Sequence, residues 1–370
     1  MADFNGAYRG RRVFLTGHTG FKGSWMALWL HGLGANVTGY AHRPPPPPSL
    51  FELARVGKTL INIEADVRDA ARLRDELIAA RPDIVFHFAA QALVLAGYER
   101  PLETLETNVM GTANLLEAVR AYSHGGRPCA VVIVTSDKCY ENQEWVHGYR
   151  ETDPMGGHDP YSMSKGSAEL VVAAWRRSYF PVDGMAQHGV GVATVRAGNV
   201  IGGGDWTRDR IVVDCVRALL SGEAIQVRNP HATRPWQHVL EPLSGYLQLG
   251  ARLMAEDRVL AGNFAEAWNF GPSASGVWPV GQLVDHLIRL WSAGRWEDRS
   301  DPTARHEAKL LAVSIDKAYH RLGWRPVWNV ERALDKTVEW FKAYASRPFD
   351  AREVTQRQID EYAADRCCSN

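Results

Sequence analysis

The sequence contains no long apolar run, no excess of either charge and no cysteine spacing typical of a metal site. None of its hydrophobic segments approaches the about 20 residues of a membrane-spanning helix, and the opening residues MADFNGAYRGRR contain no apolar signal-peptide core. Lys plus Arg and Asp plus Glu each number 42, so no nucleic-acid-binding surface is indicated. The five cysteines form no C-x-x-C pair, which favours reduced thiols. We therefore expect a cytoplasmic protein that binds no metal, no membrane and no nucleic acid.

Apolar segments typical of buried strands alternate with segments of helical periodicity in the first half of the chain. We expect strands at 13–15, 37–41, 84–88, 130–135 and 192–195, and helices at 22–31, 70–80, 102–122 and 161–179. This alternation predicts an α/β fold, with a doubly wound parallel sheet covered by helices on both faces. Ligands of such sheets bind at the carboxyl ends of the strands.

The composition changes near residue 199, where Gly, Trp, Arg and Pro become frequent, as in GNVIGGGDW and RNPHATRPWQHV. Helical patterns continue at 211–221, 241–254, 281–292 and 330–345. We interpret 10–198 as a Rossmann-type dinucleotide-binding domain and 199–345 as mainly a smaller, mixed lobe that binds the substrate. A return of one segment from the C-terminal half to the first domain is left open. Residues 346–370 are expected to form a polar, partly disordered tail.

The first expected strand is followed by TGHTGFKG at 16–23, a T-G-x-x-G-x-x-G pattern. Its glycines let the backbone turn sharply and approach a pyrophosphate, which then rests on the amides of a helix N-terminus. A tight turn without a ligand is the alternative, but the position between a first strand and a helix favours a dinucleotide. The expected cofactor contacts in this loop are Gly17, Thr19, Gly20, Phe21, Lys22 and Gly23.

The acidic residue that commonly holds the ribose of NAD, some 20 positions further on, is missing. The second strand ends instead on His42 and Arg43, and Arg43 can attract the extra phosphate of NADP. The residues alone therefore leave NAD and NADP open. Asp66 and Val67 follow a further apolar segment, where they either meet the adenine or provide the N-cap of the next helix.

A strand expected to end near residue 88 is followed by small residues. Ala89, Ala90 and Gln91 would let a cofactor lie against the backbone there. Asn108, within the helix expected at 102–122, completes the expected cofactor contacts.

Two further segments carry reactive side chains. Tyr161 and Lys165 form a Y-x-x-x-K pair, one turn apart on one face of a helix, where an ammonium group favours the phenolate. Ser136 ends the strand expected at 130–135, within VTSDKCYEN. Alone, the tyrosine–lysine pair is a common helical pattern. Combined with the glycine loop and the serine, it indicates a catalytic base.

These features resemble the extended short-chain dehydrogenases/reductases. Within that family, the chain is most similar to the nucleotide-sugar 4,6-dehydratases of the CDP-glucose branch, from about residue 10 to about 345. The supporting stretches are TGHTGFKGSW, VTSDKCYEN, YSMSKGSAEL, RAGNVIGGGDW and RNPHATRPWQHVLEPLSGYL. The resemblance implies NAD as cofactor, CDP-glucose or a related nucleotide sugar as substrate, and a homo-oligomer (dimer or tetramer). It also implies a role in deoxysugar biosynthesis for a surface polysaccharide such as lipopolysaccharide O-antigen.

The resemblance also assigns catalytic roles. Tyr161 would take the proton of the C4 hydroxyl, Ser136 would bind the same oxygen, and Lys165 would hold the nicotinamide ribose. Asp137 would be the acid that protonates the departing C6 hydroxyl. Lys138 stands where the dTDP-glucose enzymes carry Glu, and two roles stay open: uncharged, it would be the base at C5, and charged, it would stabilise the enolate.

The substrate carries a diphosphate, which the guanidinium fork of arginine suits. Arg234 and Asn199 match the phosphate-binding and sugar-nucleotide positions of the family. The expected substrate contacts are Asn199, Arg210, Arg228, Arg234, His238 and Asn269.

Two other functions are compatible with parts of this pattern. A nucleotide-sugar 4-epimerase shares the fold, the cofactor and the Ser–Tyr–Lys set, but it has no need of an acid–base pair beside the serine. Asp137 and Lys138 therefore favour the dehydratase. A non-catalytic cofactor sensor would not need Tyr161 and Lys165.

Overall fold

A computed structural model describes residues 3–124, 126–273, 276–301, 310–346 and 348–368. Its centre is a seven-stranded sheet in the order β11-β6-β5-β4-β1-β2-β3, with every neighbouring pair parallel. The predicted α/β fold and doubly wound sheet are confirmed. The strands are β1 (Arg12–Thr16), β2 (Asn36–Ala41), β3 (Ile61–Glu64), β4 (Ile84–His87), β5 (Cys129–Val134), β6 (Val190–Ala197) and β11 (Ala267–Phe270).

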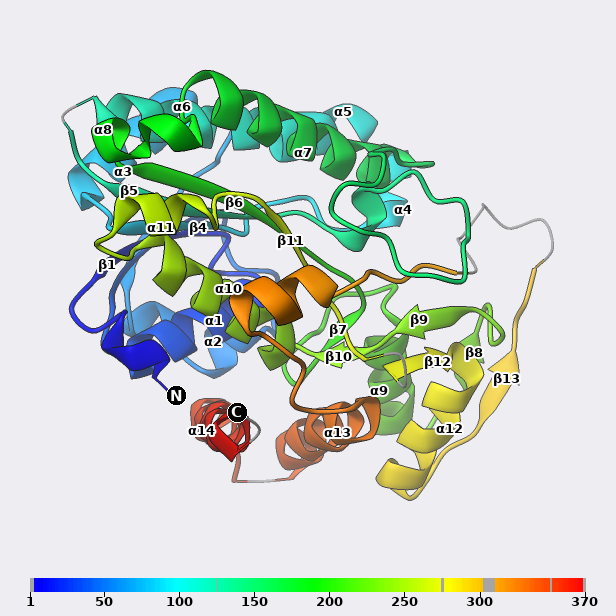
Figure 1. Cartoon of the computed structure of the whole chain (residues 1–370). Coiled ribbons are helices and arrows are strands. Elements are labelled where there is room, and N and C mark those ends of the chain that lie inside the picture. Colours follow the sequence, from blue (N-terminus) through cyan, green and yellow to red (C-terminus); the bar gives the residue numbers. More distant parts are fainter. Residues whose placement is uncertain (1–2, 125, 274–275, 302–309, 347, 369–370) are drawn as a thin grey trace.

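Helices cover both faces of the sheet (Figure 1). One face carries α3 (Ala70–Ala80), α6 (Gly111–Ser123) and α7 (Pro160–Ser178), and the other carries α1 (Phe21–Gly32) and α10 (Leu240–Leu253). Strand β5 shows why its sequence is apolar throughout. Ala130 and Val132 belong to the core under α1 and α10, whereas Val131 and Ile133 belong to the core under α6 and α7. Successive side chains of a strand point to opposite faces of the sheet. Because both faces are buried at β5, its side chains are apolar on both.

The strand order reverses direction between β1 and β4, whose ends pair through Thr16 and His87. Strands β2 and β3 are added on one side of β1, and the strands of this sheet from β4 onward are added on the other side. A crevice for a ligand therefore opens beyond the carboxyl ends of β1 and β4.

A smaller unit contains three two-stranded sheets. These are β7 (Val200–Ile201) with β10 (Gln237–His238), β9 (Thr233–Pro235) with β12 (Val277–Pro279), and β8 (Ile225–Val227) with β13 (Trp296–Asp298). Helices α9 (Ile211–Ser221), α12 (Val280–Trp291) and α13 (Val330–Ala345) accompany them. This unit has its own apolar core, to which Ile225, Leu283 and Leu334 contribute. Helix α10 and strand β11, although late in the chain, pack in the large unit.

Two segments differ from the sequence-based expectation. The residues expected to form a polar tail contain α14 (Ala351–Cys368), which packs against α1 and α13. Its few apolar side chains, including Val354, Ile359 and Tyr362, are buried, and this narrow contact gave little sequence signal. The single helix expected at 102–122 is divided into α5 (Pro101–Leu105), the π-helical turn η3 (Glu106–Met110) and α6.

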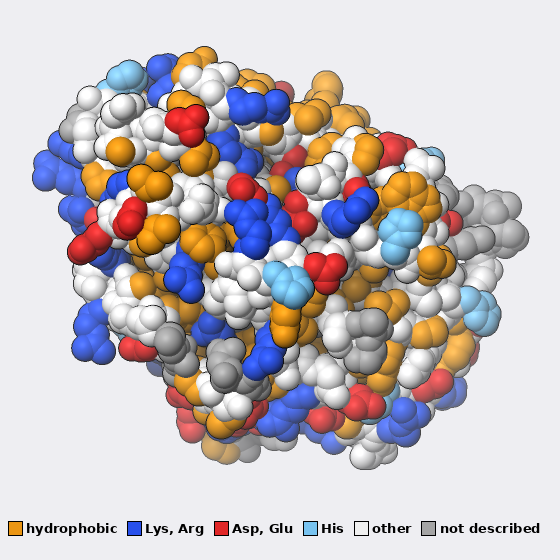
Figure 2. All heavy atoms as spheres, viewed as in Figure 1, with side chains coloured by type: hydrophobic (Ala, Val, Ile, Leu, Met, Phe, Trp, Pro, Cys, Tyr) orange, Lys and Arg blue, Asp and Glu red, His pale blue; other side chains and the backbone are white. Residues whose placement is uncertain are grey.

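The remaining elements are short. They are η1 (Phe4–Gly6), α2 (Leu50–Leu53), η2 (Val56–Lys58), α4 (Val94–Glu99), η4 (Asp137–Cys139), η5 (Val182–Gly184), α8 (Met185–His188), α11 (Arg258–Gly262) and η7 (Ala318–Leu322). Within the described ranges, no helix has both the length and the apolar character needed to cross a bilayer. Acidic, basic and hydrophobic side chains are interspersed on the face that Figure 2 shows.

Candidate active site

The glycine loop lies against the end of β4. Gly17 has a φ of +75°, and a Cβ added there would lie 2.6 Å from the backbone nitrogen of Ala89. A Cβ at Gly23 would overlap the carbonyl oxygen of Gly17. Gly20 precedes α1 and provides no side-chain cap, so the first amides of the helix are not capped by the residue before it. This arrangement fits a dinucleotide pyrophosphate.

Hydrogen bonds of buried side chains fix this loop. Thr16 Oγ1 lies 2.7 Å from His87 Nδ1 and accepts a bond from the backbone N–H of Ala89 at 3.1 Å. Ser24 Oγ donates to the carbonyl of His18 at 3.0 Å. Burial, with a smaller effect from the charge of Lys165, lowers the pKa of His87 to about 3. His87 is therefore a neutral structural residue that ties β4 to β1.

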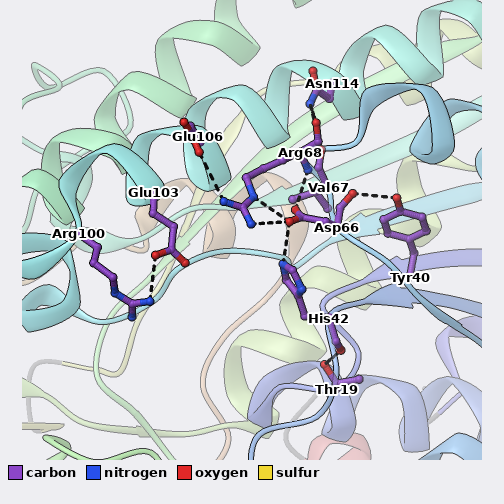
Figure 3. A network of polar contacts seen from close by, with 10 residues as sticks. All are labelled: Thr19, Tyr40, His42, Asp66, Val67, Arg68, Arg100, Glu103, Glu106 and Asn114. Carbon is purple, nitrogen blue, oxygen red and sulfur yellow. Dashed lines mark hydrogen bonds and ion pairs between the residues drawn. The ribbon is translucent and has the colours of Figure 1, made fainter.

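The loops after β2 and β3 form the polar network of Figure 3. Asp66 Oδ2 lies 3.1 Å from His42 Nε2, and Arg68 Nε donates to the same carboxyl group at 2.8 Å. Partial burial opposes ionisation of Asp66, but the bonds from Arg68 outweigh it and lower the pKa of Asp66. Tyr40 donates its hydroxyl to the carbonyl of Asp66 at 2.9 Å. The predicted residues His42 and Asp66 are thus brought together.

The structure decides one alternative left open by the sequence. The N-cap of α3 is Asp69, which accepts the amide of Arg72 at 3.0 Å, and it is not Asp66. Val67 is buried against Gly111. Arg43 is largely exposed and pairs with Glu64 at 2.6 Å.

Asn108 lies on the π-helical turn and connects two parts of the site. Its Oδ1 accepts the backbone N–H of Gln91 at 2.8 Å, and its Nδ2 donates to the carbonyl of Gln91 at 2.9 Å and to Ser164 Oγ at 2.8 Å. Both ends of the amide thus have protein partners. This geometry favours a positioning role, between the loop after β4 and helix α7, over the predicted contact with the cofactor.

The residues after β5 turn at once into the short helix η4. Ser136 is its N-cap: Ser136 Oγ accepts the backbone N–H of Lys138 at 3.2 Å and donates to Asp137 Oδ1 at 3.0 Å. The Asp137 side chain is buried, and its Oδ2 has no hydrogen-bond partner in the described part of the protein. Lys138 is half-buried.

Tyr161 and Lys165 lie on the first turns of α7. Asp159 caps this helix by accepting the amides of Tyr161 at 2.9 Å and Ser162 at 3.0 Å. Lys165 Nζ donates to the carbonyl of Val134 at 3.4 Å, so the pair faces the end of β5. The predicted residues Ser136, Asp137, Tyr161 and Lys165 therefore meet in one place.

Burial controls the protonation of this pair. It raises the pKa of Tyr161 to about 12, against a hydrogen bond with Ser136 that lowers it. It lowers the pKa of Lys165 to about 8. Burial therefore opposes the phenolate form that the charge of Lys165 was expected to favour, because a desolvated phenolate is costly.

A buried ion pair that the sequence did not predict lies beneath these residues. Glu169, on α7, binds Arg196, on β6, through Nε at 2.9 Å and Nη2 at 2.8 Å. Glu169 also accepts the hydroxyls of Thr135 at 2.5 Å and Thr194 at 2.8 Å. Burial opposes ionisation of Glu169, but Arg196 outweighs it and lowers the pKa of Glu169. The available signal was the four-residue spacing from Lys165, which places Glu169 on the same helix face.

Lys22, which belongs to the glycine loop, also interacts electrostatically with other charged residues of the site. Burial, followed by the charge of Arg210, lowers the pKa of Lys22 to about 8, while the charge of Asp137 raises it. Arg210 Nη1 in turn pairs with Asp205 Oδ2 at 2.7 Å, and the charge of Arg210 also acts on Tyr161. Lys22 and Arg210 therefore bring positive charge to the catalytic residues.

Three of the other predicted substrate residues differ in their burial and in their partners. Asn199 has a buried Oδ1 without a partner among the described residues, which suits a ligand contact. Arg234 is buried on β9 and donates to the carbonyl of Thr233 at 2.9 Å. Arg228 is exposed and lies 3.7 Å from Asp209.

Two predicted substrate contacts are placed in the protein interior. Asn269 donates from Nδ2 to the carbonyl of Tyr149 at 2.8 Å and accepts the hydroxyl of Tyr140 at 2.7 Å. His238 is fully buried between the rings of Trp25 and Trp328. Burial lowers its pKa to about 3. These contacts favour structural roles for Asn269 and His238 over the predicted contacts with the substrate.

Comparisons with known proteins show which family the chain belongs to. Residues 14–337 match the GDP-mannose 4,6 dehydratase family. The chain is 48% identical over 362 residues to the CDP-glucose 4,6-dehydratase of Salmonella typhimurium, covering 98% of each chain. Among solved structures, it is similar to the UDP-glucose 4-epimerase of Thermotoga maritima (TM-score 0.74, 23% identity, 90% of this chain and 99% of that one).

The dTDP-glucose 4,6-dehydratase DesIV of Streptomyces venezuelae, solved with NAD and TYD bound, is similar to the same degree (TM-score 0.73, 24% identity, 90% of this chain and 97% of that one). Since an epimerase and a dehydratase match equally well, the structural likeness establishes the fold alone. The sequence matches decide the family: this chain belongs to the GDP-mannose 4,6 dehydratase family.

Proposed function

We propose that this protein converts CDP-glucose to CDP-4-keto-6-deoxyglucose and water, with NAD as its cofactor. The observation that carries the proposal is the position of Asp137, buried beside Ser136 and within the electrostatic reach of Tyr161. A carboxyl group there supplies an acid that an epimerase does not need. The choice of cytidine rests on the 48% identical relative that is named a CDP-glucose 4,6-dehydratase.

The glycine loop and the network around Asp66 would hold the cofactor. A side chain at Gly17 would meet the backbone of Ala89, and one at Gly23 would meet the carbonyl oxygen of Gly17. The uncapped amides of α1 suit the pyrophosphate, and His42 with Asp66 suits the adenosine end. When bound, NAD supplies the oxidation at C4 and the later reduction at C6.

The protein's own residues handle the protons. Tyr161 takes the proton of the C4 hydroxyl while Ser136 holds the same oxygen. The ketone formed at C4 acidifies the proton on C5. Lys138 either removes that proton itself or, if it stays charged, stabilises the enolate that forms while solvent takes the proton. Asp137 then protonates the C6 hydroxyl, so the C6–O bond breaks, water leaves and a C5–C6 double bond forms.

The nucleotide diphosphate would bind on the side of the smaller unit. Arg210 and Arg234 supply positive charge there, Arg228 extends it at the surface, and Asn199 offers an unpartnered buried oxygen for the sugar nucleotide. Arginine suits this task because its planar fork matches phosphate oxygens.

A homo-oligomer and a cytoplasmic role in deoxysugar biosynthesis for a surface polysaccharide belong to the same proposal. Helices α5 and α7 present exposed apolar side chains, among them Leu102 and Leu170. Helix pairing across a two-fold axis would bury them.

Mass spectrometry tests the reaction. The purified protein is incubated with NAD in D2O and, separately, with CDP-, dTDP-, UDP- and GDP-glucose. We expect loss of water from CDP-glucose and one solvent deuterium at C5. Isomerisation without loss of water would establish the epimerase instead, and a preference for another nucleotide would correct the choice of cytidine.

A further inference from the structure

Three residues with a buried side-chain oxygen, Asp137, Gln237 and Tyr246, pack around Gly198, which follows β6, and Phe270, which ends β11. Asp137 Oδ2 points at Gly198, where an added Cβ would overlap it. Gln237 donates from Nε2 to the carbonyls of Gly198 at 3.2 Å and Phe270 at 3.1 Å. Asp137 Oδ2, Gln237 Oε1 and the hydroxyl of Tyr246 each have no hydrogen-bond partner among the described residues. Buried polar atoms normally have partners, so this cluster requires an explanation.

Tyr246 reaches this place from the opposite face of the sheet to α7. It lies on α10, which packs below the sheet in Figure 1. Its ring is held between Phe88, at 5.9 Å, and Phe270, at 5.5 Å, and it is fully buried. Burial first, and the negative charge of Asp137 second, raise the pKa of Tyr246 far above its ordinary value. The hydroxyl therefore stays protonated and remains a donor.

We propose that Tyr246 is a positioning residue for Asp137, whose Oδ2 it holds through one buried water molecule that also donates to Gln237 Oε1. Such a water would have three polar partners, the usual number for a buried water. Ser136 fixes Oδ1 from the side of the substrate, and this bridge would fix Oδ2 from below. The carboxyl group would then be held at both oxygens for proton delivery to the C6 hydroxyl. The inference rests on the proposed function.

The test separates proton delivery from the other steps. Tyr246→Phe removes only the hydroxyl and keeps the ring between Phe88 and Phe270. We expect oxidation at C4, followed by the absorbance of the reduced nicotinamide in a single turnover, to keep its normal rate. Loss of water should slow by roughly tenfold to 100-fold, as for a misplaced catalytic group, with KM little changed. Asp137→Asn should slow the same step by about 10²–10⁴.

CDP-6-deoxy-6-fluoroglucose provides the readout that a merely structural defect would not give. Fluoride leaves C6 with its electron pair and needs less protonation than hydroxide. Tyr246→Phe and Asp137→Asn should therefore both approach the wild-type rate with this analogue. Tyr8→Phe is the matched control, because the Tyr8 hydroxyl is also buried and binds α10 at the carbonyl of Leu247, at 2.6 Å. It should lose stability without any selective slowing of water loss.

The outcomes distinguish the two proposals. Normal water loss by Tyr246→Phe, with slow water loss by Asp137→Asn, overturns the role of Tyr246 alone. Equal slowing of C4 oxidation and of fluoride loss in Tyr246→Phe also overturns it, because the defect is then structural. Normal water loss by Asp137→Asn removes Asp137 as the acid and overturns the proposed mechanism itself.

Discussion

Glu169 and Arg196 form a bidentate ion pair that is almost completely buried, with N–O distances of 2.8 and 2.9 Å. The same carboxylate accepts the hydroxyl of Thr135, the residue before Ser136, and lies one helical turn after Lys165. One pair thus fixes the end of β5 and the catalytic face of α7 relative to each other.

We expect Glu169→Gln to lower the free energy of unfolding by about 3 kcal/mol, because it leaves the guanidinium of Arg196 buried without a counter-charge. Urea unfolding followed by circular dichroism measures this loss. Glu103→Gln is the control, since Glu103 pairs with Arg100 at the surface, at 2.9 Å. It should change the unfolding free energy by less than about 1 kcal/mol. Equal effects of the two substitutions would show that the buried pair contributes no more to the free energy of unfolding than the surface pair does.

We expect Tyr161→Phe to abolish oxidation at C4, because it removes the phenol beside Ser136 that takes the hydroxyl proton in the proposed reaction. The absorbance of the reduced nicotinamide after mixing with CDP-glucose measures this step. Tyr179→Phe, at the far and exposed end of the same helix, should retain the normal rate. Normal oxidation by Tyr161→Phe would refute the assignment of the base.

Exchange of the C5 proton with D2O distinguishes the two roles of Lys138. Lys138→Ala should slow this exchange in either role, while C4 oxidation continues. Lys138→Arg keeps a positive charge but cannot accept a proton near neutral pH. Recovery of exchange in Lys138→Arg would therefore indicate enolate stabilisation, and continued loss would indicate the base. If Lys138→Ala exchanges at the wild-type rate, neither role is correct.

The affinity for NAD should fall as the pH rises above about 8. The pKa of Lys22 is about 8 in the free protein, lowered from 10.5 by burial first. A pyrophosphate stabilises the ammonium form and raises this pKa, so binding above pH 8 must take up a proton. By thermodynamic linkage, each proton taken up on binding lowers the affinity for NAD by at most about tenfold per pH unit.

Isothermal titration calorimetry between pH 7 and pH 9.5 measures this dependence. Lys165 titrates in the same range, so the decisive comparison is with Lys22→Met. The logarithm of the affinity for NAD should fall less steeply with pH in this variant, by a slope of about one. Lys58→Met, in η2 on the surface, should keep the wild-type slope. An unchanged slope in Lys22→Met would place Lys22 away from the pyrophosphate.

The sequence alone was sufficient to predict those strands and site residues whose positions follow from local rules. The apolar runs that became β1, β2, β4, β5 and β6 were predicted because buried parallel strands are apolar on both faces. The position of Ser136 after β5, and the one-turn spacing of Tyr161 and Lys165, placed these residues together without any knowledge of packing.

Sequence-based prediction is least informative where long-range packing decides. Asn269 and His238 were expected at the substrate, yet polar side chains near strand ends serve buried networks equally well. Glu169 and Arg196 are 27 residues apart, and only the packing of α7 against β6 brings them together. Asp69 is the cap of α3, three residues after Asp66, and either carboxylate would have satisfied the sequence rule.

The π-helical turn at Glu106–Met110 makes chain length, and not only residue identity, a requirement of the site. A π turn contains one residue more than an α-helical path, so deleting a single residue there would restore a regular helix. Such a deletion would also rotate α5 by about 100° relative to α6. Asn108 would turn away from Ser164, and the exposed side chain of Leu102 would face a new direction. The length of this segment therefore determines both the buried contacts of Asn108 and the shape of the outer surface.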